Sequence, residues 1–139
     1  MPEKGTNADT QRTGVGYIRV STSRQEELSP AAQKRELLKY AKDHDIILLD
    51  FYYDDGISGR EVKKRQGFKD MIAFAKSPDH PIDCILVWKF SRFARNQEES
   101  IVYKALLRKN KVDVISITEY VEGPFGSLIE RIIEWMDEY

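Results

Sequence analysis

Hydrophobic residues along this chain form two patterns that alternate from one end to the other. Mostly apolar runs of strand length occupy residues 15–21, 46–53, 82–88 and 112–118. Runs of this kind are typical of parallel strands that are buried on both faces. The sequence therefore predicts four strands in a buried sheet.

The segments between these runs place apolar residues every three or four positions, which is the spacing of one helix face. A first helix is expected to begin after Ser29, with Pro30 as its first residue, and to extend to about Asp43. Further helices are expected over residues 68–75, 96–106 and 128–139. The order β-α-β-α-β-α-β-α predicts an α/β fold, a mainly parallel sheet of four or more strands with helices on both faces.

Two helix starts carry a capping signature. Asn96 with Glu99 resembles a capping box, and Ser127 with Glu130 forms a second one. The apolar pattern of the last helix still continues at Tyr139, with no closing glycine and no proline. We therefore expect residues 15–139 to be one domain cut from a longer protein, the alternative being a natural C-terminal helix. Residues 1–14 are polar and are expected to form a flexible extension.

Composition excludes several classes of protein. Hydrophobic content of 41% with 32% charged residues fits a soluble globular domain, and the apolar runs fall far short of the roughly 18 residues of a membrane span. The single cysteine, Cys84, allows no disulfide within one chain, so the expected compartment is the reducing cytoplasm. A net charge of -1 does not suggest a free-standing nucleic-acid binder, although residues 60–69 form a basic stretch.

The candidate chemistry is a serine hydroxyl close to several arginines. Ser21 ends the first predicted strand, and Arg19, two residues earlier, lies on the same strand face. Arg92 and Arg95 stand three residues apart at the start of a predicted helix. The carboxyl ends of parallel strands share one edge, so these groups are expected to meet there. A hydroxyl facing guanidinium groups is suited to attack a phosphodiester, and Arg65 in the basic stretch is a further candidate phosphate clamp.

Simpler interpretations remain open for each of these residues. Ser21 could merely end a strand, and the arginines could form a solvated basic turn. Other chemistries fit less well, because His44 and His80 lie in polar turns and Ser21 lacks the G-x-S-x-G surroundings of a hydrolase nucleophile. The chain has no clustered metal ligands, no P-loop and no dinucleotide fingerprint. We expect neither a metal nor a cofactor.

Taken together, these motifs resemble the catalytic domain of the serine recombinases, the resolvase/invertase family. The resemblance covers residues 15–139 and is closest to the large serine recombinases. The motifs that carry it are residues 16–22 (GYIRVST), 28–33 (LSPAAQ), 54–59 (DDGISG), 65–68 (RQGF) and 89–96 (KFSRFARN).

The resemblance implies a reaction and an assembly. Ser21 would attack a DNA phosphodiester to form a 5′-phosphoserine link and release a 3′-hydroxyl, and religation would need neither ATP nor a metal. The substrate would be double-stranded DNA at specific recombination sites, bound by a homodimer that pairs into a synaptic homotetramer. The last helix would form the dimer contact, and no membrane is involved.

By the same resemblance, Arg19, Arg92 and Arg95 surround the scissile phosphate and Arg65 lies on a mobile loop. The supporting positions match Tyr17, Gln25, Gln33 and Asp83. One departure matters, because Ser91 stands where small resolvases carry an aspartate. The group that removes the proton from Ser21 is left open, since arginine stays protonated.

Two other classes of function remain as alternatives. The first is a non-catalytic phosphate- or nucleotide-binding module on a flavodoxin-like sheet. The second is an assembly domain that uses its last helix to pair subunits.

Overall fold

The computed structural model describes residues 11–20, 28–55, 65–94 and 96–119, which form a four-stranded parallel sheet with helices. The strands are β1 (Arg12–Val20), β2 (Ile46–Asp55), β3 (Cys84–Val87) and β4 (Asp113–Ser116), in the order β2-β1-β3-β4. The helices are α2 (Pro30–Asp43), α3 (Gln66–Lys76), α4 (Phe90–Phe93) and α5 (Gln97–Lys109). The predicted helix over residues 128–139 lies outside the described residues.

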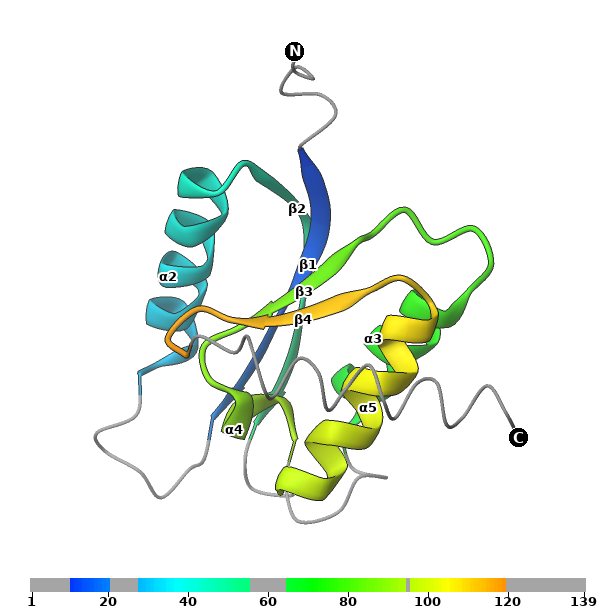
Figure 1. The fold of residues 1–139 in the computed structure, drawn as a ribbon. Coiled ribbons are helices and arrows are strands. Elements are labelled where there is room, and N and C mark those ends of the chain that lie inside the picture. Colours follow the sequence, from blue (N-terminus) through cyan, green and yellow to red (C-terminus); the bar gives the residue numbers. More distant parts are fainter. Residues whose placement is uncertain (1–10, 21–27, 56–64, 95, 120–139) are drawn as a thin grey trace.

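Helices cover both faces of the sheet, as Figure 1 shows, with α2 on one side and α3 and α5 on the other. On the α2 side, Leu37 and Ala41 pack in one core cluster with Ile18 of β1. On the opposite side, Phe68 of α3 and Leu107 of α5 belong to a second cluster. The predicted α/β architecture with a parallel sheet is therefore confirmed.

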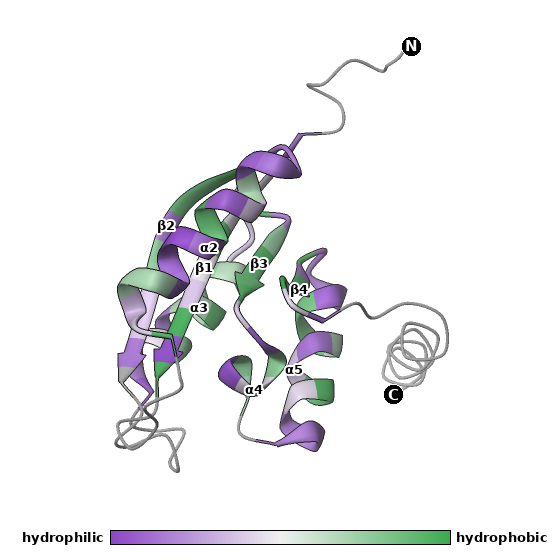
Figure 2. Ribbon diagram, turned by 90° about the vertical axis from the view of Figure 1, so that its left-hand side faces the viewer, coloured by the Kyte–Doolittle hydropathy of each residue, from purple (hydrophilic) through white to green (hydrophobic). Residues whose placement is uncertain are grey.

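Strand β3, one of the two central strands, shows most clearly that the sheet is buried on both faces. All four of its residues are buried, with Ile85 and Val87 in one core cluster and Cys84 and Leu86 in the other. Figure 2 shows β3 as hydrophobic, whereas the carboxyl end of β2 is hydrophilic. Each large apolar side chain buried in this way contributes about 1.5–3 kcal/mol. Burial also raises the pKa of the Cys84 thiol to about 11.

Two helices begin where their capping residues stand. Ser29 accepts a hydrogen bond from the amide of Ala32 at 3.1 Å, and Pro30 is the first residue of α2, as the sequence predicts. Asn96 is extended (φ -148°) and its side-chain oxygen accepts from the amide of Glu99 at 2.7 Å, which starts α5 at Gln97. Both caps satisfy amides that have no partner inside the helix.

The first strand begins at Arg12, three residues before the predicted Val15, so residues 12–14 belong to the sheet and not to a polar extension. Hydrogen bonding explains the difference. The backbone of Thr13 exchanges two bonds with Asp83, and the Arg12 guanidinium pairs with Asp113 at 3.0 Å. These contacts carry no hydrophobic periodicity. Conversely, β3 and β4 are shorter than their apolar runs.

The sequence puts Arg92 at the entry of the helix that Asn96 caps, whereas the structure has a separate short helix before that cap. Helix α4 is one turn long, Ala94 is extended (φ -135°, ψ 158°), and α5 begins only at Gln97. The Asn96 cap accounts for the break, because a capping residue has extended backbone angles and cannot continue a preceding helix. Arg92 therefore lies in α4 and not at the start of the longer helix.

The start of α3 is packed directly on β2 and generates a prediction. A Cβ atom added at Gly67 would overlap the carbonyl oxygen of Tyr53. We expect Gly67→Ala to lower the free energy of unfolding by about 2 kcal/mol, because overpacked sites relax only at such a cost. Urea unfolding measures this loss. The matched control Gln66→Ala, exposed on the same turn, should stay within about 0.5 kcal/mol of wild type. A Gly67→Ala protein as stable as this control would contradict the packing.

Candidate active site

The strand order indicates that a ligand would bind at the carboxyl ends of the central strands. Strand β2 pairs with one side of β1 and β3 pairs with the other side. The chain therefore passes outward from β1 to β2 and then returns across β1 to β3, so the direction of the strand order reverses at β1. In open parallel sheets, ligands bind outside the carboxyl ends at such a switch point. Strand β1 ends at Val20, and β3 ends at Val87 shortly before α4. Ser21 follows Val20 directly and lies outside the described residues, as do Gln25 and Arg95.

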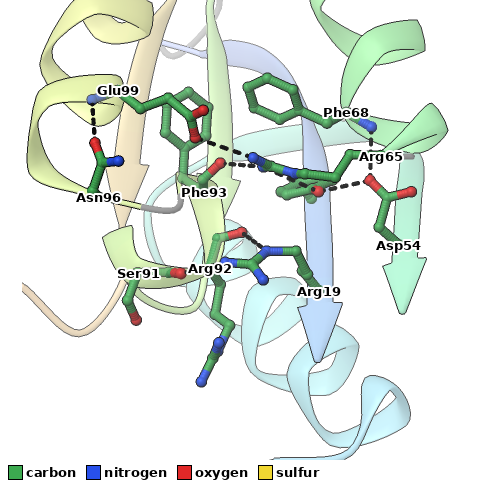
Figure 3. Close-up of polar contacts among 10 residues, drawn as sticks. Arg19, Asp54, Arg65, Phe68, Ser91, Arg92, Phe93, Asn96 and Glu99 are labelled. Carbon is green, nitrogen blue, oxygen red and sulfur yellow. Dashed lines mark hydrogen bonds and ion pairs between the residues drawn. The ribbon is translucent and has the colours of Figure 1, made fainter. Parts of the chain in front are cut away.

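Arg19 connects the end of β1 to α4. Its side chain is only 7% exposed, and it donates to the carbonyl oxygens of Ser91 at 2.6 Å and Arg92 at 3.3 Å. The last carbonyls of a helix have no partner inside it, and a cation at that end is electrostatically favourable. Figure 3 shows the Arg19 guanidinium directed at this carbonyl end of α4. Arg19 thus contacts the backbone of Arg92, while a shared phosphate between the two guanidinium groups stays a prediction.

Arg65 holds the same helix from the other side. Its side chain is fully buried, and the guanidinium donates to the carbonyl oxygen of Phe93 and pairs with Glu99 at 3.2 Å. The guanidinium also lies over the ring of Phe68, 4.0 Å from its centroid. The sequence indicated an arginine in a polar basic loop, whereas these contacts are all with the protein interior. Arg65 would have to leave them before it could contact a phosphate.

The two arginines together hold three successive carbonyls at the end of α4, those of residues 91–93. The side chain of Arg92, which is half-buried, points away from this network toward the side on which the strands end (Figure 3). Because these hydrogen bonds hold the backbone of α4, they fix the position of the Cα atom from which the Arg92 side chain extends.

Asp54 links this network to α3. Its carboxylate accepts from the amides of Gly67 and Phe68, both at 2.9 Å, and from the Tyr17 hydroxyl at 2.7 Å. It thus caps α3 from a neighbouring strand, at the amino end where negative charge is favoured. The signal available in the sequence was its position at the carboxyl end of β2.

Tyr17 is a buried donor in this network. Burial raises the pKa of Tyr17 well above its ordinary value, the Arg65 charge opposes this rise, and the hydrogen bond to Asp54 adds to it. The phenol therefore stays protonated at neutral pH and donates to the carboxylate. Tyr17 is positioned near the site, but it cannot serve as a base there.

The other two supporting residues have different positions. The amide nitrogen of Gln33, which is fully buried, donates to the carbonyls of Arg19 at 3.3 Å and Leu28 at 3.1 Å. It thus joins the residues on either side of the segment that contains Ser21. Asp83 lies at the amino end of β3, where it accepts from the amide of Thr13 at 3.0 Å. Asp83 therefore lies at the amino end of the sheet, away from Arg19, Arg65 and Arg92 at the carboxyl end.

The amino end of α4 has a partner that no sequence motif revealed. An oxygen of Glu119 accepts from the amide of Phe90 and from the hydroxyl of Ser116, both at 2.8 Å. The ammonium of Lys104, a buried residue of α5, lies 3.1 Å from the centroid of the Phe90 ring. Burial lowers the pKa of Lys104 to about 8, against the opposing influence of Glu119.

The described residues offer no metal site and no membrane-spanning helix. They contain no group of three or more histidine, cysteine, aspartate or glutamate residues that could hold a metal ion. Among the helices just described, none has both the length and the hydropathy needed to cross a membrane.

Comparisons with known proteins point to one family. The family model described as "Resolvase, N terminal domain" matches residues 14–139. The N-terminal catalytic domain of TP901-1 integrase is similar in structure, with 29% identity and a TM-score of 0.71, over 91% of this chain and 95% of that one. A resolvase family site-specific recombinase from Streptococcus pneumoniae shares 28% identity at a TM-score of 0.71, over 92% of this chain and 89% of its own.

A more distant structure supports the fold alone. The C-terminal catalytic domain of ISC1926 TnpA, an IS607-like serine recombinase, shares 20% identity at a TM-score of 0.64, over 88% of this chain and 79% of that one. No curated protein gives a significant sequence match.

The buried pair of Arg65 and Glu99 generates a prediction about stability. We expect Glu99→Ala to lower the free energy of unfolding by about 3 kcal/mol, because it leaves a buried guanidinium without its counter-charge. Urea unfolding of the variant provides the measurement. Glu98→Ala is the matched control, since Glu98 is exposed on the same helical turn and should cost about 0.5 kcal/mol. Equal losses in the two variants would show that the pair has no special role.

Lys104 generates a prediction about pH. Its pKa is about 8 in the folded protein against an ordinary 10.5, so the unfolded chain binds more protons between these values and stability rises with pH there. Urea unfolding of wild type and Lys104→Met should be compared from pH 7 to pH 10. We expect the difference to move in favour of wild type by about 2 kcal/mol over this interval. A difference independent of pH would show that Lys104 keeps an ordinary pKa.

Proposed function

This chain belongs to the resolvase family of site-specific recombinases, and we propose that Ser21 supplies the nucleophile of its DNA cleavage reaction. The family model and the two solved structures that share more than a quarter of its residues identify the chain as the catalytic domain of a serine recombinase. Its substrate is DNA. Motifs such as KFSRFARN at residues 89–96 resemble those of the large serine recombinases, and we infer that the chain is nearer to these within the family.

The observation that carries the proposal is the contact between Arg19 and α4. Arg19 is buried two residues before Ser21, and its guanidinium holds the carbonyls of Ser91 and Arg92. The end of the strand that leads to Ser21 and the helix that carries Arg92 are therefore joined at the switch point of the sheet. A hydroxyl and a guanidinium brought to one edge are what phosphodiester attack requires.

The proposed reaction exchanges one phosphodiester for another. The Ser21 oxygen forms a bond to phosphorus, the bond to the 3′ oxygen breaks, and that oxygen takes up a proton. The product is a 5′-phosphoserine link and a free 3′-hydroxyl. Religation is the same displacement in reverse by a 3′-hydroxyl of the partner strand, so no nucleotide cofactor is consumed. Arg92 and Arg95 stabilise the negative charge that the phosphate oxygens gain in the transition state.

The proton of Ser21 is proposed to pass to water. Tyr17 is unsuited to accept it, since its pKa is raised and its hydroxyl already donates to Asp54. The arginines are protonated at every relevant pH, so they act by lowering the energy of the serine alkoxide.

The remaining arginines are assigned by their contacts. Arg19 positions α4. Arg65 does the same in the conformation seen here, and it would become a phosphate ligand only after leaving Glu99 and the carbonyl of Phe93. Among the supporting residues, Gln33 positions the ends of the segment that contains Ser21, and Gln25 belongs to that segment.

The proposed assembly follows the family. A homodimer would bind double-stranded DNA at a specific recombination site, and two such dimers would form a synaptic homotetramer in the cytoplasm. Because the net charge is -1, we propose that this domain contributes little of the binding free energy for DNA.

Covalent trapping tests the nucleophile. The complete natural protein is incubated with sheared genomic DNA of its source organism, quenched in detergent and digested with nuclease. Mass spectrometry should find a phosphonucleotide on Ser21, and sequencing of the captured DNA should give the recombination site. Ser21→Ala should form no adduct. An adduct that persists in Ser21→Ala, or that maps to another residue, would refute the assignment of the nucleophile, whereas a wild-type protein that forms no adduct would favour the non-catalytic alternative.

Arg92→Ala should slow adduct formation on the recovered site on the order of a hundredfold while the protein still binds DNA, by analogy with the loss of an oxyanion donor. Arg35→Ala, an exposed arginine of α2, is the matched control and should leave the rate unchanged. Equal effects of the two substitutions would indicate a general loss of positive charge.

A further inference from the structure

We propose that Glu119 is a positioning residue for DNA cleavage, because it fixes the amino end of the one-turn helix α4 and thereby the direction of Arg92. This inference rests on the proposed function. Glu119 lies outside the recombinase motifs at residues 16–22, 28–33, 54–59, 65–68 and 89–96, and it acts without contacting DNA or Ser21.

Helix α4 cannot hold its own position. A single turn leaves most of its amide and carbonyl groups without partners inside the helix, and so short a helix is unstable unless its surroundings hold it. Its N-cap residue, Lys89, makes no side-chain hydrogen bond to the helix. The amide of Phe90 instead donates to the carboxylate of Glu119 at 2.8 Å.

The carboxylate of Glu119 is itself fixed. The hydroxyl of Ser116, the last residue of β4, donates to the same oxygen at 2.8 Å. The next residues are tied to the end of β3, because the amide of Ile117 donates to Val87 at 2.9 Å and the hydroxyl of Thr118 donates to the carbonyl of Trp88 at 2.8 Å. Glu119 therefore transmits the position of the sheet to the start of α4.

Side-chain hydrogen bonds hold both ends of α4. The Glu119 carboxylate lies at the amide end and the Arg19 guanidinium at the carbonyl end, which is the arrangement that the helix dipole favours. The helix has only four residues and is about 6 Å long. The loss of a hydrogen bond at either end is therefore expected to reorient the whole helix. Arg92 lies on this turn, and a misplacement of about 1 Å in a catalytic group can cost on the order of a hundredfold in rate.

The reach of Glu119 and its charge can be separated by two conservative variants. Glu119→Gln keeps the length of the side chain and an oxygen acceptor but removes the charge. Glu119→Asp keeps the charge and shortens the side chain by one methylene group. If Glu119 positions α4, the glutamine variant should work and the aspartate variant should not. If Glu119 acts through its charge, on Lys104 or on the DNA, the order should be reversed.

The experiment measures the single-turnover rate of adduct formation by the complete protein on the site DNA recovered by covalent trapping, together with the dissociation constant for that DNA. We expect Glu119→Asp to slow adduct formation by about tenfold or more and Glu119→Gln to stay within about threefold of wild type. Affinity for DNA should stay within about twofold in both variants, because neither touches the DNA.

Glu36→Asp is the matched control, since it makes the same chemical change at an exposed glutamate of α2 that takes no part in this network. A Glu36→Asp protein slowed as much as Glu119→Asp would overturn the inference in favour of a general effect of the substitution. So would a Glu119→Asp protein that cleaves at the wild-type rate, or a glutamine variant slower than the aspartate variant. A wild-type protein that forms no adduct would instead overturn the proposed function, and this inference with it.

Discussion

The contact on which the rest of the site depends is that between the guanidinium of Arg19 and the carbonyls that end α4. Burying a charged group in a sheet is costly unless polar partners replace the lost water, and here backbone carbonyls do so. Apolar packing can fix the distance between β1 and α4, but it does not fix the orientation of a single helical turn. Directed hydrogen bonds at its carbonyl end can fix this orientation. This requirement explains why a cation, Arg19, is present in the buried part of β1.

The other polar contacts extend the same arrangement. Arg65 adds the carbonyl of Phe93 and connects it, through Glu99, to α5, while Asp54 joins Tyr17 to the start of α3. Five elements, β1, β2, α3, α4 and α5, are thereby linked at the carboxyl end of the sheet. Because the arginines remain charged at any physiological pH, this framework keeps its electrostatic character where a histidine-based site would titrate.

The sequence predicts the architecture well because strand runs and helical spacing are both properties of the core. It predicts less well whatever depends on single polar contacts. The start of β1 at Arg12 depends on partners about 70 residues or more away, and α4 is too short to show a period. The burial of Arg65 depends on Glu99, 34 residues later, so its basic neighbours suggested a solvated loop. Motif resemblance selected Asp83, yet the topology places it at the amino end of the sheet.

The roles of Ser21, Gln25 and Arg95 stay predictions, since they lie outside the described residues. The burial of Cys84 has a practical consequence of a different kind. Its thiol lies in the central strand with a pKa near 11, so very little of the reactive thiolate exists at neutral pH and reagents have poor access to it. It is also the single cysteine of these 139 residues. A fluorophore can therefore be attached through an engineered surface cysteine, with the native residue kept, to follow movements of this domain during strand exchange.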